Sequence, residues 1–79
     1  MTKLPELKPA KITRALERLG FGKVRQSGSH AIYRHGDGRW TTIPVHPGKS
    51  IDPDLLSDIL KQIKITEEEF LTALRKRRR

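Results

Sequence analysis

The sequence predicts a domain of the α+β class, in which one helix, three short strands and two further helices follow one another. Apolar residues recur at helical spacing near both ends of the chain, and residues typical of strands gather between positions 22 and 45. Short turns containing glycine separate the strands. A chain of 79 residues fits one small domain, which we predict to cover residues 1–74. Residues 75–79 are all basic, and we expect them to form a disordered tail.

The first helix is expected to begin at Lys8-Pro9, because proline is favoured at the first helical position, where its missing N–H costs nothing. Gly20 is expected to end the helix, because glycine readily adopts the left-handed conformation found after helix C-termini. Between these points the apolar residues share one face of the helix, and they are Ile12, Ala15, Leu16 and Leu19.

Three strands are predicted at residues 22–26, 29–35 and 39–45. A tight turn at Ser27-Gly28 joins the first two, and the sequence GDG at 36–38 joins the second to the third. Connections this short imply an antiparallel meander. Pro44 cannot donate a hydrogen bond to a neighbouring strand, so the third strand is expected at an edge of the sheet.

Two helices are expected after a turn at 46–49, whose sequence is HPGK. Asp52 is a favourable N-cap for the first, and Thr66 with Glu69 forms a capping box for the second. The helices of the domain are expected to cover one face of a three-stranded antiparallel sheet and to leave the other face open. The order α-β-β-β-α(-α) resembles that of a double-stranded-RNA-binding domain, although a shared fold does not by itself establish function.

Strand alternation leaves two arrangements open for the second strand. His30, Ile32 and Arg34 share one face, whereas Ala31 and Tyr33 share the other. Either Ile32 packs in the core and draws His30 toward it, or Ala31 and Tyr33 pack inward and His30 faces solvent. Only the second arrangement leaves this histidine available for chemistry.

The net charge of +8 is unevenly distributed along the chain. Residues 1–49 carry ten basic and three acidic side chains, whereas residues 50–74 carry two basic and six acidic ones. A basic first half favours binding of a polyanion such as nucleic acid, although a basic surface also serves solubility alone.

Other classes of site have little support in the sequence. The three histidines have no zinc-binding spacing and there is no cysteine, so we expect no metal and no other cofactor. Phosphate-binding glycine motifs and a nucleophilic serine elbow are absent. No apolar run is long enough to span a bilayer, so we expect a cytoplasmic protein without a membrane partner.

Cleavage of RNA is the chemistry that the remaining residues favour. RNA carries its own nucleophile, the 2′-hydroxyl group, so a protein needs only to accept one proton, donate another and stabilise charge on the phosphate. A histidine serves one such transfer near neutral pH. His30 follows the turn at Ser27-Gly28-Ser29 and has basic neighbours. From the residues alone, a histidine that only hydrogen-bonds a neighbouring strand is an equally good interpretation.

Four segments together resemble a known family. They are LERLGF (16–21), VRQSGSHAIYRH (24–35), TIPVHPGKSI (42–51) and LLSDILKQIKITEEEFL (55–71). Their order and spacing are similar to those of the HicA (YcfA-like) toxins, the mRNA interferases of type II toxin–antitoxin systems. The resemblance implies a fold like that of double-stranded-RNA-binding domains, cleavage of mRNA and inhibition by a HicB-type antitoxin. It also places the catalytic histidine at His30, with Gly28 and Ser29 shaping the site.

The remaining candidates are cationic or titratable residues that would contact RNA. They are Lys23, Arg25, Arg34, Arg39, His46 and Lys49. For His46 and Lys49, contact with phosphate competes with a purely structural role in the HPGK turn. Two other functions stay open at this point: a non-catalytic RNA-binding module, and a subunit that binds mainly another protein.

Overall fold

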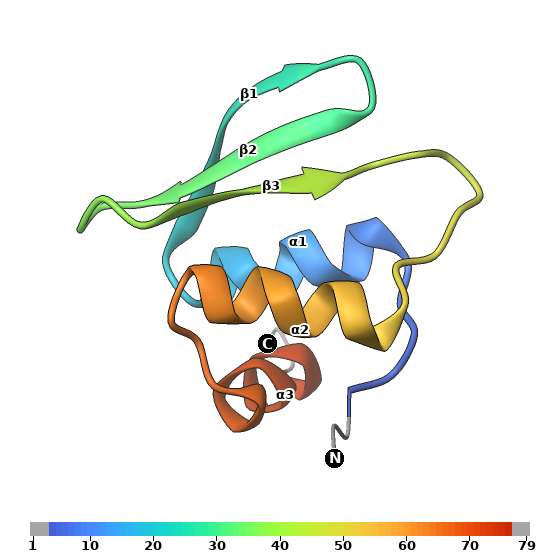
Figure 1. Ribbon diagram of the computed structural model, residues 1–79. Coiled ribbons are helices and arrows are strands. Elements are labelled where there is room, and N and C mark those ends of the chain that lie inside the picture. Colours follow the sequence, from blue (N-terminus) through green and yellow to red (C-terminus); the bar gives the residue numbers. More distant parts are fainter. Residues whose placement is uncertain (1–3, 77–79) are drawn as a thin grey trace.

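The computed structural model describes residues 4–76 and has the predicted order of elements (Figure 1). The helices and strands are α1 (Pro9–Arg18), β1 (Phe21–Ser27), β2 (His30–His35), β3 (Trp40–Pro44), α2 (Pro53–Gln62) and α3 (Glu67–Arg75). The predicted α+β class and the three-stranded antiparallel sheet are therefore confirmed.

The strands form a meander in which β2 lies between β1 and β3. Pro44 ends β3, so the expectation that the proline-containing strand lies at an edge is confirmed. The pairing of β1 with β2 shifts between Lys23 and Arg25, which leaves Val24 as the extra residue of a bulge. Val24 is 58% exposed, because most of β1 beyond Phe21 extends past the core.

The helices cover one face of the sheet, as expected. In Figure 1, α1 and α2 lie against the sheet, and α3 packs against α1 and α2 as a further layer. Each element contributes apolar side chains to a single core, whose members that are less than 2% exposed include Ile12, Leu16, Ile43, Leu56, Leu60, Ile63 and Phe70. Burial of these side chains is the main stabilising contribution in so small a domain.

The predicted caps are present at both C-terminal helices. The Asp52 carboxylate accepts a hydrogen bond from the backbone N–H of Leu55 at 2.7 Å. At α3, the Thr66 hydroxyl accepts from the Glu69 N–H at 3.0 Å, and the Glu69 carboxylate accepts from the Thr66 N–H at 2.9 Å. This reciprocal pair is the capping box expected from the sequence, and it fixes where α3 begins.

Two hairpins have the glycines that their turns require. Gly28 has a φ of +59° and occupies the first position of the two-residue turn between Ser27 and His30, so this turn begins one residue later than predicted. In the second hairpin, Gly38 has a φ of +103° and donates to the His35 carbonyl at 2.9 Å, which closes the three-residue loop expected at GDG.

One connection was not predicted. Leu7 and Ile51 form an isolated antiparallel bridge with N–H···O distances of 3.1 and 2.7 Å, which ties the segment before α1 to the loop before α2. At the other end, α3 includes Arg75, the first residue of the predicted basic tail. The expected disorder of that tail falls mainly on residues 77–79, which lie outside the described residues.

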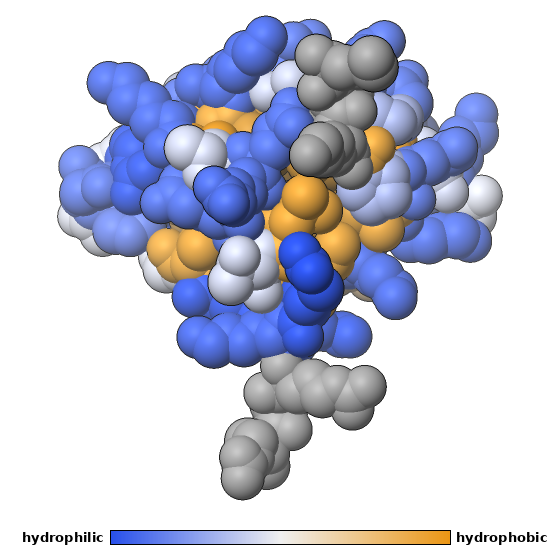
Figure 2. All heavy atoms as spheres, turned by 90° about the horizontal axis from the view of Figure 1, so that it is seen from below, coloured by the Kyte–Doolittle hydropathy of each residue, from blue (hydrophilic) through white to orange (hydrophobic). Residues whose placement is uncertain are grey.

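The side of the molecule farthest from the sheet is mainly hydrophilic, with small apolar areas between charged side chains (Figure 2). No helix within residues 4–76 is long and apolar enough to cross a membrane.

Candidate functional site

His30 lies at the start of β2 and is exposed to solvent. Ala31 and Tyr33 are 1% and 6% exposed and face the helices, so the structure selects the second of the two arrangements allowed by strand alternation. Residues that pair directly across antiparallel strands point to the same side of the sheet. His30 pairs with Ser27 on β1 and with Pro44 on β3, and all three therefore belong to the open face.

The Gly28-Ser29 turn connects His30 to the loop that follows β3. The backbone carbonyl of Ser29 accepts a hydrogen bond from the Val45 N–H at 2.7 Å. Its hydroxyl lies 3.2 Å from Nε2 of His46, within hydrogen-bonding distance. The direction of this bond depends on the protonation of His46: a neutral, unprotonated Nε2 accepts from the hydroxyl, whereas a protonated one donates to it.

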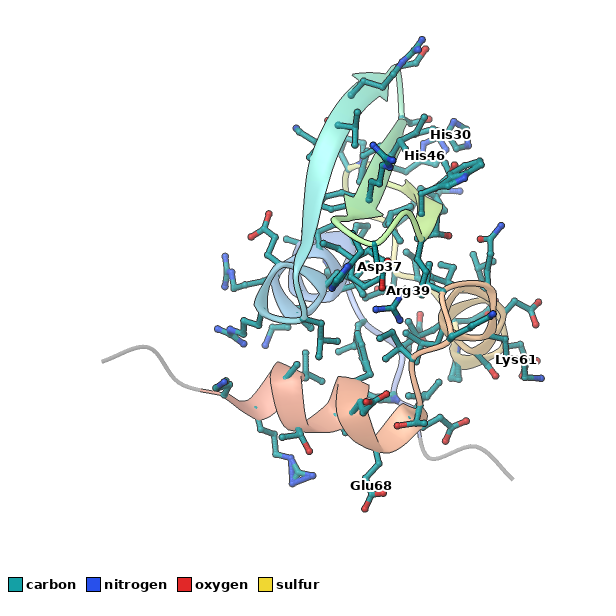
Figure 3. The ribbon with its side chains drawn as sticks, turned by 90° about the vertical axis from the view of Figure 1, so that its left-hand side faces the viewer. His30, Asp37, Arg39, His46, Lys61 and Glu68 are labelled. Carbon is teal, nitrogen blue, oxygen red and sulfur yellow. The ribbon has the colours of Figure 1, made fainter. Side chains whose placement is uncertain are left out.

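His30 and His46 thereby lie beside each other (Figure 3). Their ring centroids are 6.4 Å apart and the ring planes meet at 73°. Both side chains are exposed, so a ligand can reach either ring. Two imidazoles at this separation can serve as a proton acceptor and a proton donor on either side of one phosphate group. The sequence suggested each histidine separately, but Ser29 and His46 are 17 positions apart in the chain, which concealed the approach of the two rings.

Two of the predicted cationic residues lie on the same face as His30. Arg25 pairs with Ile32, and Arg34 pairs with Trp40, so both arginines project from the open side of the sheet. Both are exposed, and neither forms a salt bridge in the part of the chain described here. None of the strand residues 21–27, 30–35 and 40–44 is acidic. The charged strand residues of the open face are therefore the cations Arg25 and Arg34.

Lys23 projects from the helix-covered side of the sheet, and Lys49 lies in the loop that follows β3. Lys23 pairs with the inward-facing Tyr33, and its ammonium group donates to the Gln26 side chain at 3.1 Å. Lys49 is exposed and ends the HPGK turn, in which its N–H donates to the His46 carbonyl at 3.2 Å. Gly48 has a φ of +75°, as the third residue of a type II turn requires, so the turn expected at 46–49 is present. This turn brings the backbone of Lys49 next to that of His46.

Arg39 lies apart from the two histidines, at the opposite end of β3. Its guanidinium donates to the Asp37 carboxylate at 2.9 Å and to the Ile63 carbonyl at 2.8 Å, and it lies over the Phe21 ring. Figure 3 shows Asp37 and Arg39 together, away from His30. These contacts tie the β2–β3 turn to the C-terminal end of α2, so the structure gives Arg39 a structural role at this place and does not bring it to the candidate site.

The Arg39–Asp37 contact also changes the chemistry of the carboxyl group. The backbone N–H of Arg39 donates to Asp37 at 3.0 Å, and this hydrogen bond is the main cause that lowers the pKa of Asp37 below its ordinary value of 3.8. The guanidinium of Arg39 and the nearby His35 lower the pKa in the same direction. Asp37 is therefore an ionised turn residue, and it is not suited to act as an acid or a base near neutral pH.

His35 packs as a structural residue at the same end. Its ring meets the Phe21 ring edge-on at 5.1 Å, and its Nδ1 accepts a hydrogen bond from the Asp37 N–H at 3.0 Å. A Cβ atom at Gly20 would lie 2.7 Å from its Nε2, so glycine is required where α1 turns into β1. Of the three histidines, His30 and His46 are the two that the structure leaves open to a ligand.

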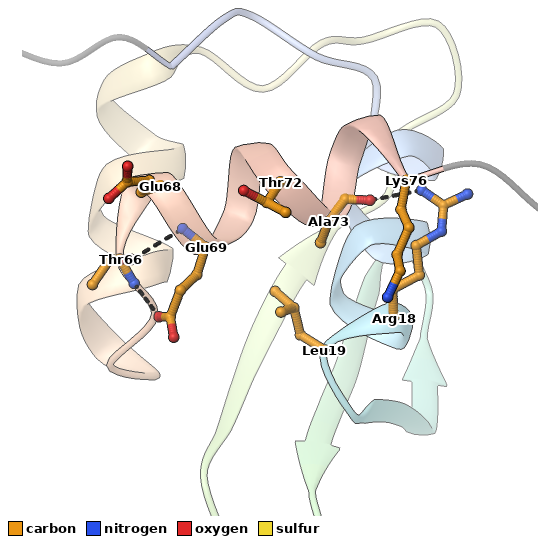
Figure 4. Close-up of a pocket in the computed structure, with 8 residues that line it drawn as sticks. All are labelled: Arg18, Leu19, Thr66, Glu68, Glu69, Thr72, Ala73 and Lys76. Atoms are coloured by element: carbon orange, nitrogen blue, oxygen red, sulfur yellow. Dashed lines mark hydrogen bonds between the residues drawn. The ribbon is translucent and has the colours of Figure 1, made fainter.

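A separate pocket of about 310 Å³ lies between the end of α1 and α3 (Figure 4). Arg18 lines it and donates to the Ala73 carbonyl at 2.8 Å, which also accepts from the Lys76 N–H at 3.2 Å. The pocket lies in the helix layers and away from the open face that carries His30. Elsewhere in residues 4–76, no three His, Cys, Asp or Glu side chains come together in a way that could hold a metal ion.

The fold and the site together define a small α+β domain whose candidate functional residues lie on an open, cationic sheet face. A family model described as the HicA toxin of bacterial toxin–antitoxin systems matches residues 9–65, and the chain belongs to this family. No curated protein matches the chain. The resemblance found in the sequence is thus confirmed, and the chain is one half of a toxin–antitoxin pair. The family match ends before α3, which the structure nevertheless packs into the same core.

Proposed function

We propose that this toxin is an endoribonuclease that cleaves mRNA by acid–base catalysis at the histidines of the open face, without a metal ion. The observation that carries the proposal is the pair of exposed imidazoles, His30 and His46, with centroids 6.4 Å apart beside the Gly28-Ser29 turn. The cationic strands and the family's resemblance to mRNA interferases support it. His30 is the catalytic residue implied by the resemblance, and Gly28 and Ser29 shape the turn that presents it.

The proposed reaction is an internal transfer of the phosphate group. One imidazole accepts the proton of the 2′-hydroxyl group as the 2′-oxygen forms a bond to phosphorus. The other, protonated imidazole donates its proton to the 5′-oxygen as the bond between that oxygen and phosphorus breaks. The products are a 2′,3′-cyclic phosphate and a 5′-hydroxyl group, so no water molecule and no metal enters this step. Arg25 and Arg34 hold the negatively charged strand on the face.

Ser29 has a positioning role in this scheme. Its hydroxyl lies 3.2 Å from Nε2 of His46 and thereby orients that ring, leaving Nδ1 as the atom that exchanges a proton with RNA. Histidines that work in catalysis are commonly held in this way by a second hydrogen-bonding group.

The assignment of His46 is tested with a substrate whose 5′-oxygen at the cleavage site is replaced by sulfur. A thiolate leaves without protonation, so such a substrate does not need the general acid. We expect His46→Ala and His30→Ala each to slow cleavage of ordinary RNA by about 10²- to 10⁴-fold. The sulfur substrate should restore the rate of one variant only, which identifies the acid. Restoration of neither, or a nearly unaltered rate for His46→Ala on ordinary RNA, would contradict a proton transfer by His46.

The function itself is tested with the purified chain, single-stranded RNA and DNA of the same sequence, all in the presence of a metal chelator. We expect the RNA to be cut and the DNA to stay intact, because DNA lacks the 2′-hydroxyl nucleophile. A chain that binds the RNA in a salt-sensitive manner but never cuts it, with or without added metal ions, would instead support the alternative function of a non-catalytic RNA-binding module.

The antitoxin is proposed to be a HicB-type protein that inhibits by covering the open face. An acidic surface complementary to Arg25 and Arg34 would speed association and keep RNA away from His30. In the complex, we expect His30 to be buried by the antitoxin. A complex in which RNA still reaches His30 would contradict this mode of inhibition.

A further inference from the structure

The open face has a second feature at the end away from the histidines. Trp40 is 52% exposed, although it is the largest apolar side chain of the protein and a buried core lies directly behind the sheet. It pairs directly across from Arg34, so the indole and the guanidinium lie side by side on the open face. Thr41 and Ile43 point to the opposite side of β3 from Trp40 and are fully buried. The exposure of Trp40 is therefore set by the strand register, and packing of the core does not require an indole here.

An exposed aromatic ring beside an arginine, on strands that carry no carboxylate, suits single-stranded nucleic acid. Bases of single-stranded nucleic acid stack on aromatic side chains, while neighbouring cations contact the phosphates. An acidic protein surface is also attracted to Arg25 and Arg34 and can pack on an indole, so binding of a protein partner is one of the outcomes that the experiment distinguishes. In double-stranded RNA the bases are already stacked on each other and cannot reach it.

The position of Trp40 relative to His30 fits a single-stranded RNA that crosses the whole open face of the sheet. His30 pairs with Pro44 at one end of the β2–β3 ladder, and Arg34 pairs with Trp40 at the other. Arg34 lies four positions after His30 on β2, which corresponds to roughly 13 Å along the strand. Ile32 and Thr42 lie between the two ends and are half-buried, and Arg25 on β1 pairs with Ile32, so the charged strand residue beside the path is a cation that attracts phosphate.

We propose that Trp40 and Arg34 form a binding subsite on which one unpaired base of single-stranded RNA stacks, a few nucleotides from the phosphate that lies between the histidines. The proposal rests on the proposed ribonuclease function for the identity of its ligand, and it adds the place where a base outside the cleaved bond is held. Stacking of this kind tolerates different bases, so the subsite supplies affinity and selects for unpaired RNA.

The single tryptophan of the chain gives the test its probe. The unaltered protein is titrated with a mixed-sequence oligoribonucleotide carrying 2′-O-methyl groups, which lacks the nucleophile and stays uncut. We expect the indole fluorescence to be quenched as the base stacks. Inorganic polyphosphate, which has charge but no bases, and a fully paired RNA duplex should bind with little quenching. Binding of the single strand without quenching would overturn the proposal.

Affinities of variants for the same labelled oligonucleotide give a second, independent measurement. Trp40→Ala should weaken binding by about 5- to 100-fold, whereas Trp40→Phe, which keeps a ring, should stay within a few-fold of the unaltered chain. Arg34→Ala should also weaken binding, whereas its charge control Arg14→Ala, which removes an exposed cation from α1, should have a smaller effect. Thermal unfolding at an unchanged temperature would show that Trp40→Ala is folded. Equal affinity of Trp40→Ala and the unaltered chain would overturn the subsite.

The two proposals can fail separately. Quenching by the uncut oligonucleotide, together with no cleavage of ordinary RNA, would keep the subsite and reject the ribonuclease. Cleavage of ordinary RNA, together with no quenching by the uncut oligonucleotide, would keep the ribonuclease and reject the subsite. Quenching by a purified antitoxin but not by RNA would assign the Trp40 face to a protein partner and would reject the base-stacking subsite.

Discussion

Replacement of His30 by alanine is expected to reduce RNA cleavage by about 10²- to 10⁴-fold and to leave the stability of the fold within about 0.5 kcal/mol of the unaltered chain. The activity falls because one of the two proton transfers loses its donor or acceptor. Stability hardly changes because the His30 side chain is exposed, and the contact that the substitution removes is the edge-to-face one with His46. The measurements are the single-turnover cleavage rate and urea-induced unfolding.

His35→Ala is the matched control for His30→Ala, since it removes the same kind of ring from the other end of β2. It should lower stability by about 1–2 kcal/mol, because a half-buried ring packed against Phe21 and an acceptor for the Asp37 N–H are both lost. Cleavage at a temperature well below unfolding should stay within a few-fold of normal. If His35→Ala lost activity and His30→Ala kept it, the site would lie at the other end of the sheet.

Replacement of Phe70 by alanine is expected to lower the free energy of unfolding by about 3–5 kcal/mol. Phe70 is fully buried, and its removal leaves a cavity between α3 and the helices that cover the sheet. A small domain has a total stability of only about 5–15 kcal/mol, so this single change would unfold a large fraction of the molecules at elevated temperature. Unfolding in urea, followed by far-ultraviolet circular dichroism, measures the loss.

Thr72→Ala provides the comparison on the same helix, because Thr72 is exposed and alanine is a better helix former. Its effect should be within about 0.5 kcal/mol. Comparison of Phe70→Ala with Thr72→Ala tests whether α3 belongs to the folded domain, since the family match stops at residue 65 and does not include α3. Equal, small effects of both substitutions would show that α3 is not part of the folded core.

Features of the fold that depend on neighbouring residues were predictable from the sequence. Asp52 and Thr66 mark helix starts because their side chains bond to backbone groups within the next few residues. The glycines at 28 and 38 mark hairpins because the backbone there has a positive φ. Strand alternation also reduced the position of His30 to two choices, and the core decided between them.

Features that depend on distant residues were not predictable in the same way. Arg39 was a candidate for binding RNA, but its guanidinium meets the carbonyl of Ile63, 24 residues away in the sequence. The bulge at Val24 and the bridge between Leu7 and Ile51 likewise follow from the register of segments that pack from afar. The approach of His46 to His30 belongs to this group: the sequence named His46 as a candidate for contact with RNA, and its position beside His30 emerged only from the structure.

The chemical nature of the cut ends tests the account most directly. The purified chain is incubated with single-stranded RNA and a metal chelator, and the products are analysed by mass spectrometry. Acid–base catalysis by the two histidines predicts 2′,3′-cyclic phosphate and 5′-hydroxyl ends on the fragments, and predicts their loss in His30→Ala. Fragments that carry 3′-hydroxyl and 5′-phosphate ends, or identical products from His30→Ala at an unaltered rate, would contradict it.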